Sequence, residues 1–86
     1  MVYPMKIKIL GPGCVNCKTL ANRTLEAVQQ LEIEATVEKV EDIQAIASYG
    51  ILRTPGLVID ERVVSYGMVP KVEEIKALIL KQSAKV

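Results

Sequence analysis

Two observations predict an α/β fold with one four-stranded mixed sheet flanked by three helices. Near the start, apolar residues alternate with lysines at the period of a strand, and the period then changes to that of an amphipathic helix. Further on, a strand–helix–strand pattern implies a right-handed parallel crossover, and two strands joined by two residues imply a hairpin. One sheet satisfies both patterns, so the predicted element order is β-α-β-α-β-β-α.

The first strand and the first helix are separated by a break that contains two glycines. Residues 5–10 form the expected strand, and Gly11-Pro12-Gly13 stops it. Apolar residues then recur at helical spacing, which predicts an amphipathic helix over residues 15–31. The apolar stripe of this helix contains Cys17, Leu20, Ala21, Leu25, Val28 and Leu31.

The middle of the chain predicts a second strand, a short helix and a third strand. Residues 33–38 alternate between apolar and polar side chains, as expected for a strand. Asp42 is suited to cap a short helix that Gly50 ends. Leu57-Val58-Ile59 is too apolar to alternate, so we expect this third strand in the centre of the sheet.

A hairpin and a last helix complete the pattern. Asp60-Glu61 turns the third strand into a fourth, Arg62 to Tyr66, and Pro70 suits the first turn of the last helix. The apolar stripe of that helix contains Val72, Ile75, Leu78 and Ile79. We expect the first and third strands to be central and mutually antiparallel, with the second strand parallel to the first.

Length and charge limit the partners. The 86 residues are enough for one domain, 1–86, and the formal net charge of +1 gives no basic excess that would indicate nucleic acid. No apolar run approaches the ~18 residues of a membrane span, and Met1–Lys6 lacks the apolar core of a signal peptide. We therefore expect no membrane partner and a cytoplasmic location.

Several acidic residues lie close together in the middle of the chain, and we interpret them as a solvent-exposed face. They are Glu32, Glu34, Glu38, Glu41 and Asp42.

Cys14 and Cys17 carry the expected chemistry. They lie where a strand ends and a helix begins, so free helix N–H groups and the helix dipole favour a thiolate at Cys14, and Lys18 adds a cation. The three-residue spacing places Cys17 on the same helix face and within the apolar stripe, so it is the more buried sulfur. Cys14 then attacks a substrate disulfide, and Cys17 attacks Cys14 to release the reduced substrate.

Three other interpretations of the pair stay open at this point. Buried cysteines are common small hydrophobic residues. Two sulfurs also suit a carrier of a soft cation such as Cu(I), and an adaptor could bind its partner in one redox state without turnover. The chain has no His, which excludes Ser-His and Cys-His nucleophiles, and two cysteines cannot complete a structural zinc site. We expect no cofactor and no resident metal.

The chain resembles the thioredoxin superfamily, and most closely its small, glutaredoxin-sized redox-active disulfide proteins. The resemblance covers about residues 5–80 and rests on the Gly11–Cys17 segment after the first strand, Thr54-Pro55 before the third, and Gly67 with Val69-Pro70 before the last helix. It implies a thioredoxin fold and a protein dithiol–disulfide oxidoreductase that works with a protein substrate and a reductase. Nothing in the sequence requires more than a monomer.

The resemblance also assigns residues around the cysteines. In that family the Thr-Pro bond is cis and faces the cysteines, and the backbone before the proline pairs with substrate, which implies this role for Thr54. Lys8 takes the place of the family's buried acid, and we expect its side chain to reach the surface. From the residues themselves, we expect a small apolar rim around Cys14, formed by Pro12, Val15, Ile51 and Thr54. The candidate substrate-binding residues are Pro12, Gly13, Val15, Thr54, Pro55 and Gly67.

Overall fold

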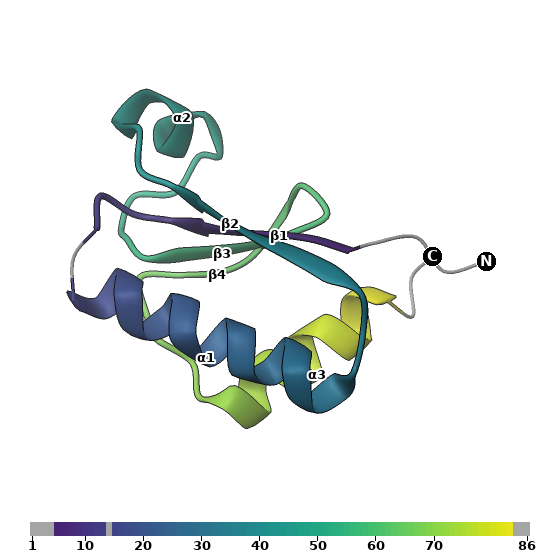
Figure 1. The fold of residues 1–86 in the computed structure, drawn as a ribbon. Coiled ribbons are helices and arrows are strands. Elements are labelled where there is room, and N and C mark those ends of the chain that lie inside the picture. The colour runs from purple at the N-terminus through teal and green to yellow at the C-terminus, as the bar shows by residue number, and fades with distance from the viewer. Residues whose placement is uncertain (1–4, 14, 84–86) are drawn as a thin grey trace.

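A computed structural model of the chain describes residues 5–13 and 15–83 and confirms the predicted element order (Figure 1). The elements are β1 (Met5–Leu10), α1 (Val15–Leu31), β2 (Ala35–Val40), α2 (Ile43–Ser48), β3 (Gly56–Ile59), β4 (Arg62–Tyr66) and α3 (Val72–Ser83). In the described part of the chain, no helix is long and apolar enough to cross a bilayer.

The four strands form one mixed sheet in the order β2-β1-β3-β4, as predicted. β1 is parallel to β2 and antiparallel to β3, and β3 is antiparallel to β4. Because the carboxyl ends of two parallel strands meet at one edge, the loop after β1 and the residues after β2 lie at the same end of the sheet. Helices α1 and α3 cover one face, and α2 lies on the other (Figure 1).

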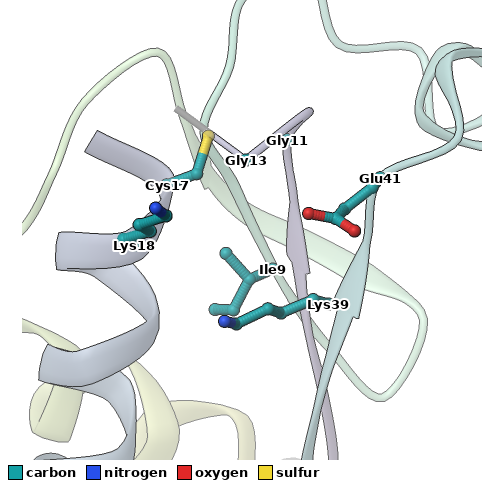
Figure 2. Close-up of a pocket in the computed structure, with 7 residues that line it drawn as sticks. All are labelled: Ile9, Gly11, Gly13, Cys17, Lys18, Lys39 and Glu41. Atoms are coloured by element: carbon teal, nitrogen blue, oxygen red, sulfur yellow. The ribbon is translucent and has the colours of Figure 1, made fainter. Parts of the chain in front are cut away.

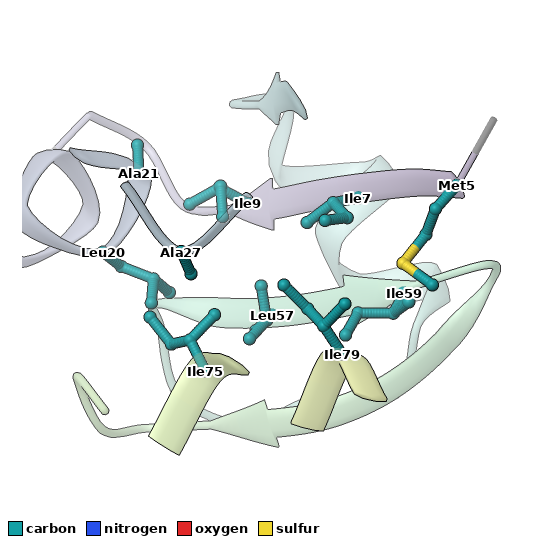
Figure 3. Packing of buried hydrophobic residues seen from close by; sticks show 10 residues of the cluster. All are labelled: Met5, Ile7, Ile9, Leu20, Ala21, Ala27, Leu57, Ile59, Ile75 and Ile79. Carbon is teal, nitrogen blue, oxygen red and sulfur yellow. The ribbon is translucent and has the colours of Figure 1, made fainter. Parts of the chain in front are cut away.

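The larger core lies between the sheet and the two longer helices. Ile7 of β1 and Leu57 of β3 are fully buried there, and Ile75 and Ile79 of α3 lie against them (Figure 3). The core on the α2 face is smaller, and its fully or nearly fully buried side chains are Leu10, Ile46 and Val58. The odd-numbered residues of β1 thus pack into the larger core, and Leu10 packs into the smaller one, because side chains alternate between the two faces along a strand.

The stripe predicted for α1 was wrong at Leu25, whose side chain is 52% exposed. Thr24 and Ala27 are buried instead. Each residue turns a helix by about 100°, so the position after Thr24 points away from the sheet. The buried Thr24 hydroxyl donates to the Leu20 carbonyl oxygen at 2.8 Å, which satisfies its hydrogen-bonding requirement.

Two predicted boundaries were also wrong by two residues. β2 begins at Ala35 rather than at residue 33, and α3 begins at Val72, so Pro70 lies before the helix and not in its first turn. The first helical bond of α3 runs from the Ile75 N–H to the Lys71 carbonyl oxygen. The Lys71 N–H in turn donates to the carboxylate of Glu74, so a glutamate caps the helix from within its first turn.

Candidate active site at the carboxyl end of the central strand

Cys17 lies in the first turn of α1, with its side chain only 5% exposed. Helix α1 starts at Val15, so Cys17 belongs to the first turn, whose backbone N–H groups lack helical acceptors. The prediction of a buried sulfur at Cys17 is confirmed. Cys14, the predicted nucleophile, lies outside the described residues.

Gly11 permits the close approach of β1 to the start of α1. A methyl group built at Gly11 would overlap the Sγ atom of Cys17 and lie 3.1 Å from its Cβ atom. The Gly11 N–H donates to the Val40 carbonyl oxygen at 2.9 Å, which continues the β1–β2 ladder by one bond. Gly11 was not among the predicted site residues, although a glycine directly after a strand and shortly before a cysteine was a usable signal.

A small pocket of about 30 Å³ opens beside Cys17 (Figure 2). Its lining consists of Ile9, Gly11, Gly13, Cys17, Lys18, Lys39 and Glu41. Glu41 follows β2 directly, and its Oε2 atom lies 3.0 Å from the position that a Cβ atom on Gly13 would take. Gly13 itself has a φ of +92°, which L side chains rarely adopt. Lys39 and Glu41 were not predicted to belong to the site.

The Thr54–Pro55 peptide bond is cis, as the resemblance implied. Pro55 is fully buried, whereas Thr54 is exposed. The Cβ atom of Thr54 lies 3.9 Å from the Cβ position of Gly11, the residue that also contacts Cys17. The structure therefore brings Thr54 to the same end of the sheet as Cys17.

Gly67 continues this arrangement from the end of β4. Its N–H donates to the Pro55 carbonyl oxygen at 2.9 Å, and its φ is +74°. A Cβ atom at this position would lie 3.2 Å from the Cβ atom of Arg53. The glycine thus lets the chain after β4 pack closely on the segment that leads into Pro55.

Three of the four residues predicted for the apolar rim lie at the surface. Pro12, Val15 and Thr54 are exposed, and the Val15 side chain is 78% exposed. Ile51 is half-buried and packs against the core on the α2 face, so it contributes to packing rather than to the rim.

Two further apolar side chains are exposed in the loops that lead to and from this end of the sheet. Leu52, two residues before Thr54, is 92% exposed, and Met68, directly after Gly67, is 62% exposed. Neither was predicted, although each lies within two residues of a predicted site residue. Exposed apolar side chains are typical of a surface that contacts another protein where they form a contiguous patch.

The Lys8 side chain reaches the surface, as predicted, and does so on the face of the sheet opposite to α1 and Cys17. On the α2 face its Nζ donates to the Tyr49 hydroxyl at 3.0 Å and to Glu61 at 2.7 Å, and the Tyr49 hydroxyl donates to the other Glu61 oxygen at 3.1 Å. The hydrogen bond to Glu61 raises the pKa of Lys8, and the same bond lowers the pKa of Glu61. The position of the family's buried acid is thus occupied by a cation held in a polar cluster.

Comparisons with known proteins agree with this geometry. A family model described as a thioredoxin domain matches residues 5–80. A thioredoxin of Methanothermobacter thermautotrophicus is 40% identical over 75 residues, covering 87% of this chain and 97% of its own length. A thioredoxin of Methanocaldococcus jannaschii is 40% identical over 70 residues, covering 81% of this chain and 80% of its own.

A solved structure extends the comparison to the fold. The J-Trx1 fragment of ERdj5 matches with a TM-score of 0.65 and 18% identity, over 94% of this chain and 44% of that structure. This match supports the thioredoxin fold for the described part of the chain, whose four-stranded sheet is flanked by helices. None of these comparisons supports a metal carrier.

Proposed function

Because the chain belongs to the thioredoxin-domain family, we propose that Cys14 and Cys17 are the residues that carry out its thiol–disulfide exchange. Family membership makes the chain a protein disulfide oxidoreductase, whose general partners are protein disulfides and a reductase. The observation that carries the assignment is the buried sulfur of Cys17 in the first turn of α1, against Gly11.

The exchange proceeds in two steps that balance in electrons. The Cys14 thiolate attacks one sulfur of a substrate disulfide, a mixed disulfide forms, and the other substrate sulfur leaves as a thiolate. The Cys17 thiolate then attacks Cys14, the intramolecular disulfide forms, and the second substrate sulfur leaves with the electron pair. The protein loses two electrons and the substrate gains them. A reductase restores the dithiol by the same chemistry in reverse.

Substrate docks at the surface formed by Thr54, by the exposed apolar side chains of the loops on either side of β3 and β4, and by the start of α1. Thr54 precedes the cis proline and is exposed, so its backbone is available to an extended substrate segment. Val15, Leu52 and Met68 offer apolar contact area of the kind that a flexible protein segment covers. A monomeric state, a single domain over residues 1–86 and a cytoplasmic location stay predictions.

Two cysteine variants test the assignment. Cys14→Ser is expected to abolish disulfide exchange, because the one remaining thiol, that of Cys17, is buried and does not reach a substrate disulfide. Cys17→Ser is expected to accumulate mixed disulfides with substrate, which mass spectrometry detects. Full exchange by Cys14→Ser would contradict the proposal.

Alkylation with iodoacetamide tests the nucleophile directly. The reaction is followed over a wide pH range, and mass spectrometry assigns the modified cysteine. It shows whether Cys14 reacts at lower pH than an ordinary thiol, whose pKa is about 8.5.

A further inference from the structure

We propose that Glu41 is the proton acceptor that converts the Cys17 thiol into the attacking thiolate, a role that rests on the exchange proposed above. Cys17 from the first turn of α1 and Glu41 from the end of β2 line the same small pocket (Figure 2). The carboxylate of Glu41 also lies against the backbone of Gly13, the residue before Cys14. Glu41 thus lines the pocket beside the buried sulfur although 24 positions separate it from Cys17 in the sequence.

A proton acceptor is needed because Cys17 is buried. Burial disfavours the charged form of a thiol, and only the thiolate attacks a disulfide. Among the described side chains that line the pocket, Lys18 and Lys39 can donate hydrogen bonds but cannot accept a proton in their charged form. Glu41 supplies the one carboxylate of that lining. Lys8 and Glu61 are held together in the polar cluster on the opposite face of the sheet.

The size of the pocket allows the proton to travel through water. About 30 Å³ is enough for a water molecule, which needs polar partners such as a carboxylate and an ammonium group. The Cys17 proton passes to Glu41, leaving a neutral carboxyl group and a thiolate. The thiolate forms the bond to Cys14, the substrate thiolate leaves with the electron pair, and the proton on Glu41 returns to solvent or to that leaving thiolate. Lys18 and Lys39 stabilise the transient negative charge on Cys17.

Stopped-flow reduction of DTNB separates the two steps. DTNB is an aromatic disulfide that releases a coloured thiolate once when Cys14 attacks and a second time when Cys17 resolves the mixed disulfide. In Glu41→Gln, the second release is expected to slow about tenfold relative to the first, because solvent only partly replaces the lost base. The deficit should shrink as pH rises, since solvent hydroxide then removes the proton. Glu41→Asp, which keeps the carboxylate, should recover most of the rate.

Glu38→Gln is the matched control, because it removes the same charge from β2 on the face away from Val37 and α1. An unchanged or faster second release in Glu41→Gln would overturn the inference, since loss of a negative charge alone should promote the Cys17 thiolate. A wild-type protein that releases the coloured thiolate only once would instead refute the resolving role of Cys17, and with it both proposals. The two failures are therefore distinguishable.

Discussion

Gly11 lies so close to the sulfur of Cys17 that a methyl group at position 11 would overlap that sulfur. Gly11→Ala must therefore displace either the first turn of α1 or the end of β1. Forcing an extra carbon into such a packed position costs about 1–3 kcal/mol. We expect this loss in urea unfolding of the reduced protein, together with slower release of substrate by Cys17. A variant as stable as the wild type would show that the loop relaxes freely around the added methyl group.

The face of α1 that packs on the sheet can be tested by a matched pair of substitutions. Leu20 is fully buried, so Leu20→Ala should lower the free energy of unfolding by about 2–5 kcal/mol. Leu25 is half-exposed on the same helix, so Leu25→Ala should change it by less than about 0.5 kcal/mol. Chemical denaturation of both variants measures the difference. Equal losses would place Leu25 in the core, as its spacing in the sequence first predicted.

The pairing of Lys8 with Glu61 gives stability a defined pH dependence. The pKa of Glu61 is lowered in the folded chain from an ordinary 4.5, so its contribution is present above about pH 4.5 and is lost as pH falls through the folded pKa. The pKa of Lys8 is raised, so its contribution is complete below the ordinary pKa of 10.5 and is lost as pH rises through the folded value.

Urea midpoints of wild type and Glu61→Gln across pH measure this contribution. The wild type should be the more stable protein near neutral pH, and the two curves should converge on the acid side. Glu34→Gln, an equal charge change at an exposed position, serves as the control. A constant difference in urea midpoint between wild type and Glu61→Gln at all pH values would mean that the hydrogen bonds of the cluster, rather than its charges, stabilise the folded chain.

The exposed side chain of Leu52 is expected to distinguish protein substrates from small disulfides. Leu52→Ser should raise the KM for a protein disulfide several-fold, because apolar area is lost at the proposed docking surface, and should leave the reduction of DTNB nearly unchanged. Ile43→Ser removes another exposed apolar side chain, 65% exposed, from α2 and serves as the control. An equal change in KM for both variants would indicate a general loss of surface hydrophobicity without a defined dock.

The sheet and the helices were predictable because local patterns determine them. The alternation in residues 5–10 and the apolar Leu57-Val58-Ile59 run place the central strands, and Asp42 caps α2 as expected by accepting the Ala45 N–H. The face of α1 was harder to predict, because a threonine at position 24 can be buried once its hydroxyl bonds to the helix backbone.

The surroundings of Cys17 were only partly predictable, since they depend on how distant segments meet. Glu41 belongs by composition to a run of solvated acids, and its position in the pocket follows only from the parallel pairing of β1 with β2. That pairing was itself predicted, so residues directly after the second strand could have been placed beside the loop that precedes α1. The overlap at Gly11, in contrast, depends on the angle at which α1 leaves the sheet, which no local pattern specifies.

The unequal cores on the two faces of the sheet have a consequence for local unfolding. Helix α2 is held by Ile46 and by the polar cluster around Tyr49, whereas α1 and α3 share the larger core. Regions with few buried apolar contacts open at lower free energy than the rest of a domain. The segment between β2 and β3 should therefore exchange its amide hydrogens before the central strands do. Because this segment begins at Glu41 and ends at Pro55, its opening would move Glu41 out of the pocket and Thr54 away from the docking surface, while the buried sulfur of Cys17 stays in place.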